Sequence, residues 1–297
     1  MRALRRLAFA VVAALVPVLS DAAETACPRH FVDGTAPDLA NPKLAPRTRE
    51  LCYSEFAVLH SGVTRTPLWS AEHLTRAQVE TARALDREGT FHPDPNLPKR
   101  ERAELADYAR SGFDRGHMAP SGDMSDRRAQ QESFSLANII PQNPDNNRDL
   151  WSDIEAAVRR LAQREGVVYV ITGPIFQGEN LQQLNGRVLV PTHVFKAIYV
   201  PRRQQAGAYV APNAPGDAWE AVSIAALEQL TGIDVFPTLP EAIKATAMPL
   251  PDPDAPRRKP RQRATGPAAG NGAGTVPWAD ACRVRSFRRE EHHPVCK

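Results

Sequence analysis

The chain has 297 residues, 42% of them hydrophobic and 24% charged, with a formal net charge of +3. Residues 1–22 carry +2 and residues 251–297 carry +5, so residues 23–250 together carry −4. The positive charge therefore comes from the two ends and does not indicate a basic active surface. No stretch after residue 22 is apolar enough to cross a membrane, which excludes an integral membrane protein once that segment is removed.

Residues 1–22 have the pattern of a Sec-type signal peptide. Three arginines precede 13 nearly all apolar residues, 7–19, and small residues at 20–23 permit cleavage. The run is too short to span a bilayer as a mature helix, although an uncleaved anchor stays an alternative. We therefore expect a periplasmic or secreted protein with no membrane contact after cleavage.

All four cysteines follow the signal-like segment, and an even number in an exported chain favours disulfides. Three pairings are possible, and the local one joins Cys27 to Cys52 and Cys282 to Cys296. A zinc site with the histidines at 292–293 is the alternative, but the spacing matches no CxxC pattern.

The first part of the chain gives few regular signals. Residues 27–66 are rich in proline, glycine and charge and predict an irregular N-terminal segment. Residues 67–74 predict a strand. Thr75 and Gln78 have the spacing of a capping box, which predicts a helix through residue 85. Residues 92–98, HPDPNLP, predict a loop.

The middle of the chain predicts two strands and a helix in succession. The stretch SGFDRGHMAPSGDMS, 111–125, contains the first strand, and Ser125 is expected to cap a short helix over 126–134. The second strand, 136–140, is expected to end at Pro141. Apolar residues at helical spacing from 150 to 161 then predict a helix that Gly166 terminates.

The last part alternates strands and a helix before a linker. Strands are predicted over 167–171, 188–190 and 194–200, and a helix runs from a Ser223 cap to Gly232. We expect one domain over 23–248 and a proline- and arginine-rich linker and tail over 249–297.

The string DRGH, 114–117, suits the hydrolysis of a phosphodiester. A histidine can take the proton of an attacking water near neutral pH, and an arginine can offset the charge that the phosphate gains. Alternation along a strand would place Arg115 and His117 on one face. Gly116 between them is expected to let a bulky polyanion approach the backbone.

The following helix offers a metal site. Mg²⁺ keeps most of its waters, so one side-chain oxygen such as that of Asn147 would suffice to hold it. Glu155 lies eight residues further on, roughly 12 Å along a helix. It is therefore expected to hold a metal-bound water rather than the ion itself.

These residues resemble the DNA/RNA non-specific endonuclease family, the ββα-metal nucleases. The resemblance rests on DRGH and the ordered array Asn138, Asn147 and Glu155 in ANIIPQNPDNNRDLWSDIE. It extends through VVYVITGPIF, VPTHVFKAIYV and LEQLTGIDVFP, over roughly 50–245. It implies an α+β fold, with a central, largely antiparallel sheet flanked by helices and a ββα-metal finger as the active site.

By this resemblance, His117 is the general base and Asn147 the metal ligand, with Mg²⁺ or Mn²⁺ as cofactor. Arg115 would contact phosphate and stabilise the transition state, and Asn138 and Glu155 would complete the catalytic set by orienting the site and the waters of the metal. The family also uses an arginine upstream of DRGH, for which the nearest residue is Arg87. The expected partners are DNA and RNA, cut without sequence preference, while the oligomeric state is not predicted.

Other readings of the same residues remain. Asp114 and Asp123 could be metal carboxylates, although Asp114 is better suited to anchor the backbone or a cation, and His193 is more typical of a structural strand residue. The basic run RRKPRQR, 257–263, could bind nucleic acid or could be a solvated linker. A catalytically inactive nucleic-acid-binding protein and a phosphodiesterase acting on a small substrate are the alternative functions.

Overall fold

The computed structural model describes residues 25–253. The signal-like segment, the basic run at 257–263 and the cysteines at 282 and 296 therefore lie outside the described residues, as does most of the tail. Within 25–253, seven strands form one sheet in the order β1-β2-β3-β6-β9-β10-β11, and all neighbours are antiparallel. The strands are β1 (Thr48–Cys52), β2 (Ala57–Ser61), β3 (Thr66–Thr75), β6 (Val167–Ile175), β9 (His193–Val200), β10 (Gln205–Pro212) and β11 (Glu220–Val222).

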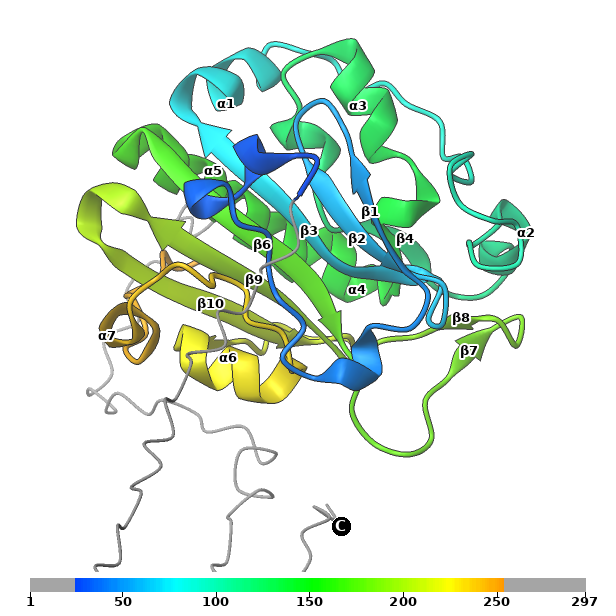
Figure 1. The fold of residues 1–297 in the computed structure, drawn as a ribbon. Coiled ribbons are helices and arrows are strands. Elements are labelled where there is room, and N and C mark those ends of the chain that lie inside the picture. The colour runs from blue at the N-terminus through cyan, green and yellow to red at the C-terminus, as the bar shows by residue number, and fades with distance from the viewer. Residues whose placement is uncertain (1–24, 254–297) are drawn as a thin grey trace, which may run out of the picture.

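Helices cover both faces of this sheet (Figure 1), which gives the α+β fold that the sequence predicts. On one face, α5 and α1 pack against strand residues such as Val170 and Ile198. On the other, α6 and the N-terminal segment around Phe31 cover Trp69 and Phe195. The helices are α1 (Arg76–Ala82), α2 (Leu105–Tyr108), α3 (Arg127–Ser133), α4 (Pro144–Asn146), α5 (Ser152–Glu165), α6 (Ile224–Thr231) and α7 (Glu241–Lys244).

A separate two-stranded unit lies beside the face that α5 covers. Its strands β4 (Asp114–His117) and β5 (Ile139–Gln142) pair antiparallel, with His117 opposite Ile139. The chain then passes through α4 and a wide helical turn, Asn147–Trp151, directly into α5. Two strands followed by a helix give the ββα arrangement that the resemblance implies. A third small sheet pairs β7 (Gln183–Leu184) with β8 (Val188–Leu189).

Several local predictions are confirmed. Thr75 and Gln78 form the capping box of α1. Gly166 ends α5, and Ser223 and Gly232 bound α6 as cap and left-handed terminus. These signals are reliable because each one satisfies backbone groups that a helix end leaves unpaired. The strands predicted over 67–74, 167–171, 188–190 and 194–200 are present, although several are longer than predicted.

Cys27 and Cys52 form the predicted local disulfide. It joins the N-terminal segment to the end of β1, and Cys27 is itself part of the core on that face of the sheet. None of the described helices is both long and apolar enough to cross a membrane.

Three other local predictions are wrong. The segment 27–66 is not irregular throughout, because it contains β1 and β2, whose polar residues mask their alternation. Pro141 lies inside β5 rather than ending a strand, which a two-stranded unit tolerates because each strand has a free edge. The chain before it, Leu136–Asn138, is a 3₁₀ turn.

The two short helices also differ at their ends from the predictions. The cap of α3 is Asp126, which accepts the amide of Ala129, while Ser125 instead donates to Glu55. The first helix, α1, ends at Ala82 rather than at residue 85.

Candidate active site

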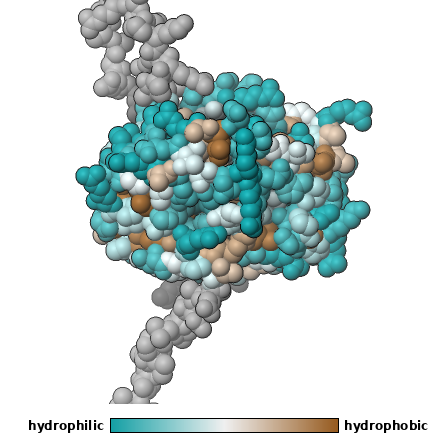
Figure 2. All heavy atoms as spheres, turned by 90° about the horizontal axis from the view of Figure 1, so that it is seen from above, coloured by the Kyte–Doolittle hydropathy of each residue, from teal (hydrophilic) through white to brown (hydrophobic). Residues whose placement is uncertain are grey.

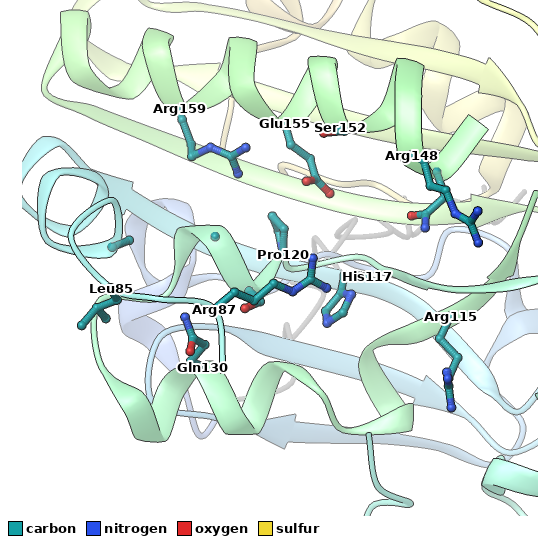
Figure 3. A pocket seen from close by; sticks show the side chains of 14 residues that line it. Leu85, Arg87, Arg115, His117, Pro120, Gln130, Arg148, Ser152, Glu155 and Arg159 are labelled. Atoms are coloured by element: carbon teal, nitrogen blue, oxygen red, sulfur yellow. The ribbon is translucent and has the colours of Figure 1, made fainter. Parts of the chain in front are cut away.

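A pocket of about 400 Å³ lies between the β4–β5 unit, α5 and the loop that follows α1 (Figure 3). Four arginines and one carboxylate line it, so the pocket is positive although residues 23–250 are negative overall. A positive concave site on a negative body selects for anionic ligands. The charged and titratable lining residues are Arg87, Arg115, His117, Arg148, Glu155 and Arg159.

His117 ends β4 and is brought to this pocket by the strand. Alternation places Arg115 and His117 on one face, and both line the pocket. Gly116 has a different role from the one predicted. A Cβ at this position would lie 1.9 Å from Oε1 of Gln142, so the glycine makes room for a side chain of the neighbouring strand, and the prediction that it admits a polyanion was wrong.

Two aromatic rings enclose the imidazole of His117. The ring centroids of Phe91 and Phe134 lie 5.4 and 5.0 Å from it. Nε2 is buried and has no hydrogen-bond partner among the described residues. Burial, and then the charge of Arg87, lower the pKa of His117 to about 3. The ring is therefore neutral at neutral pH, which is the form that can accept a proton.

Arg87 and Arg115 each stack on one of these two aromatic rings. The guanidinium carbon of Arg115 lies 4.5 Å from the centroid of Phe91, and that of Arg87 lies 5.6 Å from the centroid of Phe134. Within residues 25–253 neither arginine forms an ion pair with a carboxylate. Their charges are held in place by the rings and are available to a phosphate.

The other two arginines of the pocket are already paired. Arg148 forms a bidentate pair with Asp114, at 2.7 and 2.8 Å, and Arg159 lies 2.7 Å from the buried carboxylate of Asp123. Both aspartates are thus engaged by arginines, which supports the anchoring role proposed for Asp114 and argues against a metal role for either.

Asn147 and Glu155 project from the helical part of the unit. The side-chain amide of Asn147 donates to Asp114 at 3.0 Å, and its Oδ1 accepts no hydrogen bond from the described residues. Glu155 points from α5 into the pocket beside Arg159 (Figure 3). Burial raises the pKa of Glu155 to about 6, and Arg159 opposes that shift.

These donors fit a hydrated hard cation. The unbonded amide oxygen of Asn147 and the half-buried carboxylate of Glu155 are oxygen ligands of the kind that Mg²⁺ prefers. A cation would also relieve the raised pKa of Glu155, because a nearby positive charge favours its ionised form. In residues 25–253, the one cluster of three metal-ligand-type side chains is Cys27, Glu50 and Cys52, where the cysteines form the disulfide. An ion in the pocket would thus take most of its ligands from water.

Asn138 is not part of the pocket lining. It is fully buried, and its amide makes four hydrogen bonds: it accepts from Ser70 Oγ and Ala119 N and donates to the carbonyls of Ala119 and Ser133. All its polar groups are used in fixing the chain two residues beyond His117. Asn138 therefore lies behind the pocket, a position that suits the orienting role that the resemblance implies.

Two charged residues are buried in the sheet beneath the pocket. Lys196 of β9 donates to Oγ1 of Thr172 at 2.7 Å and lies 3.5 Å from the carbonyl of Met118, next to His117 in the chain. Its ammonium is 5.7 Å from the ring centroid of Trp151. Glu72 of β3 is 2% exposed, its two carboxylate oxygens have no partner among the described residues, and burial raises its pKa well above the usual value.

The sequence therefore identifies His117, Arg115, Asn147 and Glu155, which the structure brings to one pocket. It does not identify Arg148 and Arg159. Arg159 follows Glu155 by four residues, and this spacing on a helix would have placed it on the same face. Arg87 follows a short helix in a loop and gives no periodic signal. The resemblance names it only as the nearest arginine upstream of DRGH, and the structure places it in the pocket.

Comparison with known proteins agrees with this geometry. The family model for the DNA/RNA non-specific endonucleases matches residues 37–242. The mitochondrial nuclease EXOG of Danio rerio is 36% identical over 208 residues, which is 63% of this chain and 60% of that protein. Nuclease C1 of Cunninghamella echinulata var. echinulata is 35% identical over 62% of this chain and 81% of its own.

Among solved structures, a chain in the crystal structure of the EndoG/EndoGI complex superimposes with a TM-score of 0.59. It is 29% identical and is matched over 92% of its length and 67% of this chain. Since the family pattern covers most of the chain and the solved relative has the same architecture, this chain belongs to the DNA/RNA non-specific endonuclease family.

Proposed function

We propose that the chain is a metal-dependent endonuclease that hydrolyses phosphodiester bonds of DNA and RNA without sequence preference. The observation that carries this proposal is the neutral, buried His117 in a pocket with two unpaired arginines, Arg87 and Arg115. A histidine that has no hydrogen-bond partner, beside arginines that form no ion pair with a carboxylate, is suited to activate a water for attack on a phosphate.

In this proposal His117 accepts a proton from a water whose oxygen forms a bond to phosphorus. The bond from phosphorus to the leaving sugar oxygen breaks, and that oxygen takes up the electron pair. Arg115 and Arg87 offset the negative charge that accumulates on the phosphate oxygens. Asn147 would hold a divalent cation, with Mg²⁺ proposed and Mn²⁺ a substitute, and Glu155 would orient its waters. The cation would stabilise the leaving oxygen.

The substrate range follows from the same lining. The charged residues of the pocket are suited to contact phosphates, and contacts to phosphates do not distinguish one base from another. The site is thus suited to either nucleic acid and to any sequence.

The test is nicking of a supercoiled plasmid by residues 23–297, with Mg²⁺ or with chelator. We expect His117→Ala to lower the rate by about 10³-fold, within the range of general-base catalysis. His73→Ala is the matched control. His73 is another histidine with a lowered pKa, but it is only half-buried and stacks on Tyr169 outside the pocket. Equal cutting by wild type and His117→Ala would refute the assignment of the base.

We also propose that the protein is exported to the periplasm or medium. The signal-like segment 1–22 supports this, and so does the Cys27–Cys52 disulfide, since such bonds persist in oxidising compartments. The similar EXOG proteins are named as mitochondrial, so location has to be measured directly. An exported protein should be recovered outside the cytoplasm with an N-terminus near residue 23, whereas intact Met1 on a cytoplasmic protein would contradict export.

A further inference from the structure

A group of arginines surrounds the turn between β2 and β3, away from the pocket lining. The turn packs against the small sheet formed by β7 and β8, where the amide of Leu189 donates to the carbonyl of Thr64. Figure 1 shows this turn, β7, β8 and α2 on the same side of the molecule. We call the group the arginine patch, and its members are Arg47, Arg49, Arg65, Arg100 and Arg187.

Direct contacts connect the members of the patch. Arg65 donates to the carbonyl of Arg187 at 2.7 Å and to that of Arg100 at 3.2 Å. The carbonyl of Arg47 accepts the amide of Gly62 at the same turn. Burial, and then the nearby charge of Arg187, lower the pKa of Arg65, and Asp107 opposes this shift. Such repulsion is unfavourable in the free protein and would be relieved by an anion.

The carboxylates that pair with the arginine patch lie beneath it. Glu101 pairs with Arg49 and Arg100, and Asp107 pairs with Arg187. The side chains of Glu101 and Asp107 are 6% and 2% exposed, whereas that of Arg49 is 48% exposed and that of Arg100 is 82% exposed. Five guanidiniums over two buried carboxylates present a positive outer surface on a body that is negative overall.

The backbone is strained at two of these arginines. Arg47 and Arg65 have φ of 59° and 57°, a left-handed conformation that glycine or asparagine adopts at lower cost. Residues kept in this conformation against their preference often belong to binding surfaces. The chain places an arginine at both positions, which favours a role for the side chain rather than for the turn.

Exposed apolar side chains occur at the same place. Among the described residues the two large apolar side chains that stay exposed are Val63, in the β2–β3 turn, and Leu105, at the start of α2. The face drawn in Figure 2 is mostly hydrophilic, with scattered hydrophobic residues. Exposed apolar side chains beside exposed positive charge are typical of a surface that another molecule covers.

A chain of contacts connects the patch to the pocket. Arg115 stacks on Phe91, which also touches His117. Phe91 packs with Tyr108 in one small apolar cluster, and Asp107, the neighbour of Tyr108, pairs with Arg187 of the patch. The pocket and the arginine patch are therefore connected through one packed cluster that includes Tyr108 of α2.

We infer that the arginine patch binds the phosphate backbone of the nucleic acid several nucleotides from the bond that is cut. This inference rests on the proposed function, because it assigns a second contact region to the same substrate. A long polyanion that enters the pocket can reach both regions, whereas a mononucleotide-sized diester reaches the pocket alone.

The test is the salt dependence of binding to a labelled 30-bp duplex, measured by fluorescence anisotropy with residues 23–297 in chelator. In the double variant Arg47→Asn/Arg65→Asn, asparagine keeps the left-handed backbone and removes two charges. We expect the slope of log Kd against log salt to fall by about 2, since each lost phosphate contact removes about 0.9. Arg47→Asn/Arg100→Gln gives the same test without the backbone contacts of Arg65.

Arg202→Asn is the matched control, because Arg202 is an exposed arginine in the turn Pro201–Arg203, at the opposite end of the strands. Its slope should equal that of wild type. Hydrolysis of a small chromogenic phosphodiester should be unchanged in all variants. Slopes of the double variants equal to that of Arg202→Asn would overturn the inference, and so would a parallel loss on the small substrate. A wild-type protein that binds the duplex but cuts neither substrate would refute the proposed function alone.

Discussion

Among residues 25–253, each face of the central sheet buries one lysine, and the charges of the two lysines are compensated differently. On the face covered by α6 and α7, Lys244 contacts both carboxylate oxygens of Asp234, at 2.8 and 2.9 Å, and lies 3.3 Å from Glu228. On the pocket face, Lys196 bonds the hydroxyl of Thr172 and approaches a carbonyl, and no carboxylate within 25–253 forms an ion pair with it.

This difference indicates that the two buried lysines have different roles. The charge of Lys244 is neutralised where it lies, so its contacts serve the fold. The partners of Lys196 belong to the elements that carry the pocket, namely Met118 after His117 and Trp151 in the turn that begins at Asn147. Substitutions on the face of α6 should therefore reduce stability, and those beneath the pocket should reduce the rate of cleavage.

The largest expected effect is on the stability of the α6 face. The disulfide Cys27–Cys52 closes a sequence separation of 25 residues and fixes the segment whose Phe31 packs on Trp69 at 5.6 Å. The double variant Cys27→Ser/Cys52→Ser should lower the free energy of unfolding by about 3 kcal/mol, because the unfolded chain regains loop entropy. Urea denaturation measures the loss. The rate of plasmid nicking well below the melting temperature should be unchanged. A variant that is folded but nicks plasmid more slowly would contradict the assignment of stability to one face and of rate to the other.

The next largest effect is on the rate of cleavage, and it comes from a residue on the pocket face of the sheet. Lys196→Met removes the donor to Thr172 and the contact with Met118 but keeps the volume. We expect kcat to fall about 100-fold with KM nearly unchanged, the size of effect that a small misplacement of catalytic groups produces. The free energy of unfolding should change by less than about 1 kcal/mol, because Lys196 has no ion pair among the described residues that the substitution would break.

Kinetics on a defined duplex and urea denaturation of the same preparation test this. Lys196→Arg keeps a cationic donor and should recover part of the rate. A Lys196→Met protein that cuts normally would mean that the buried lysine does not position the pocket. One that unfolds would mean that Lys196 acts like Lys244.

The sequence predicts the parts of this molecule whose signals are local. The capping box at Thr75, the stop at Gly166 and the DRGH strand depend on residues a few positions apart, and the structure contains each of them. The order strand, strand, helix was sufficient to bring His117 and Asn147 to one pocket.

The remaining features depend on contacts between distant segments. Glu72 is charged and lies in a strand, which favours exposure, yet tertiary packing buries it completely. Gly116 is explained by the side chain of Gln142 across the β4–β5 pair, and the fourfold bonding of Asn138 depends on Ser70 of β3. Register and layer packing determine these contacts, and neither can be read from a single segment.

A smaller effect is expected for the other lysine. Lys244→Met leaves Asp234 and Glu228 without their cation. Breaking a buried ion pair can cost about 3–5 kcal/mol, but these carboxylates are 27% and 21% exposed, so we expect about 2 kcal/mol. Thermal or urea unfolding measures the loss, and the rate of nicking per folded molecule should equal that of wild type. A loss of rate without a loss of stability would reverse the assignment of the two faces.

The smallest effect is a pH dependence of the same cluster. Burial, and then Asp234, raise the pKa of Glu228 from 4.5 to about 7, so the folded protein keeps a proton that the unfolded chain releases. The stabilisation is complete below pH 4.5 and is lost as the pH rises to 7. Because Glu228 is partly exposed, solvent screening limits the loss to about 1 kcal/mol.

Glu228→Gln isolates this contribution, because glutamine is uncharged at every pH. The free energy of unfolding of wild type minus that of Glu228→Gln should fall by about 1 kcal/mol between pH 5 and pH 8, measured by urea denaturation. A difference that rises with pH would mean that Lys244 outweighs Asp234 at this carboxyl. Glu228 would then be ionised in the folded state, and the α6 face would be held by a fully charged cluster.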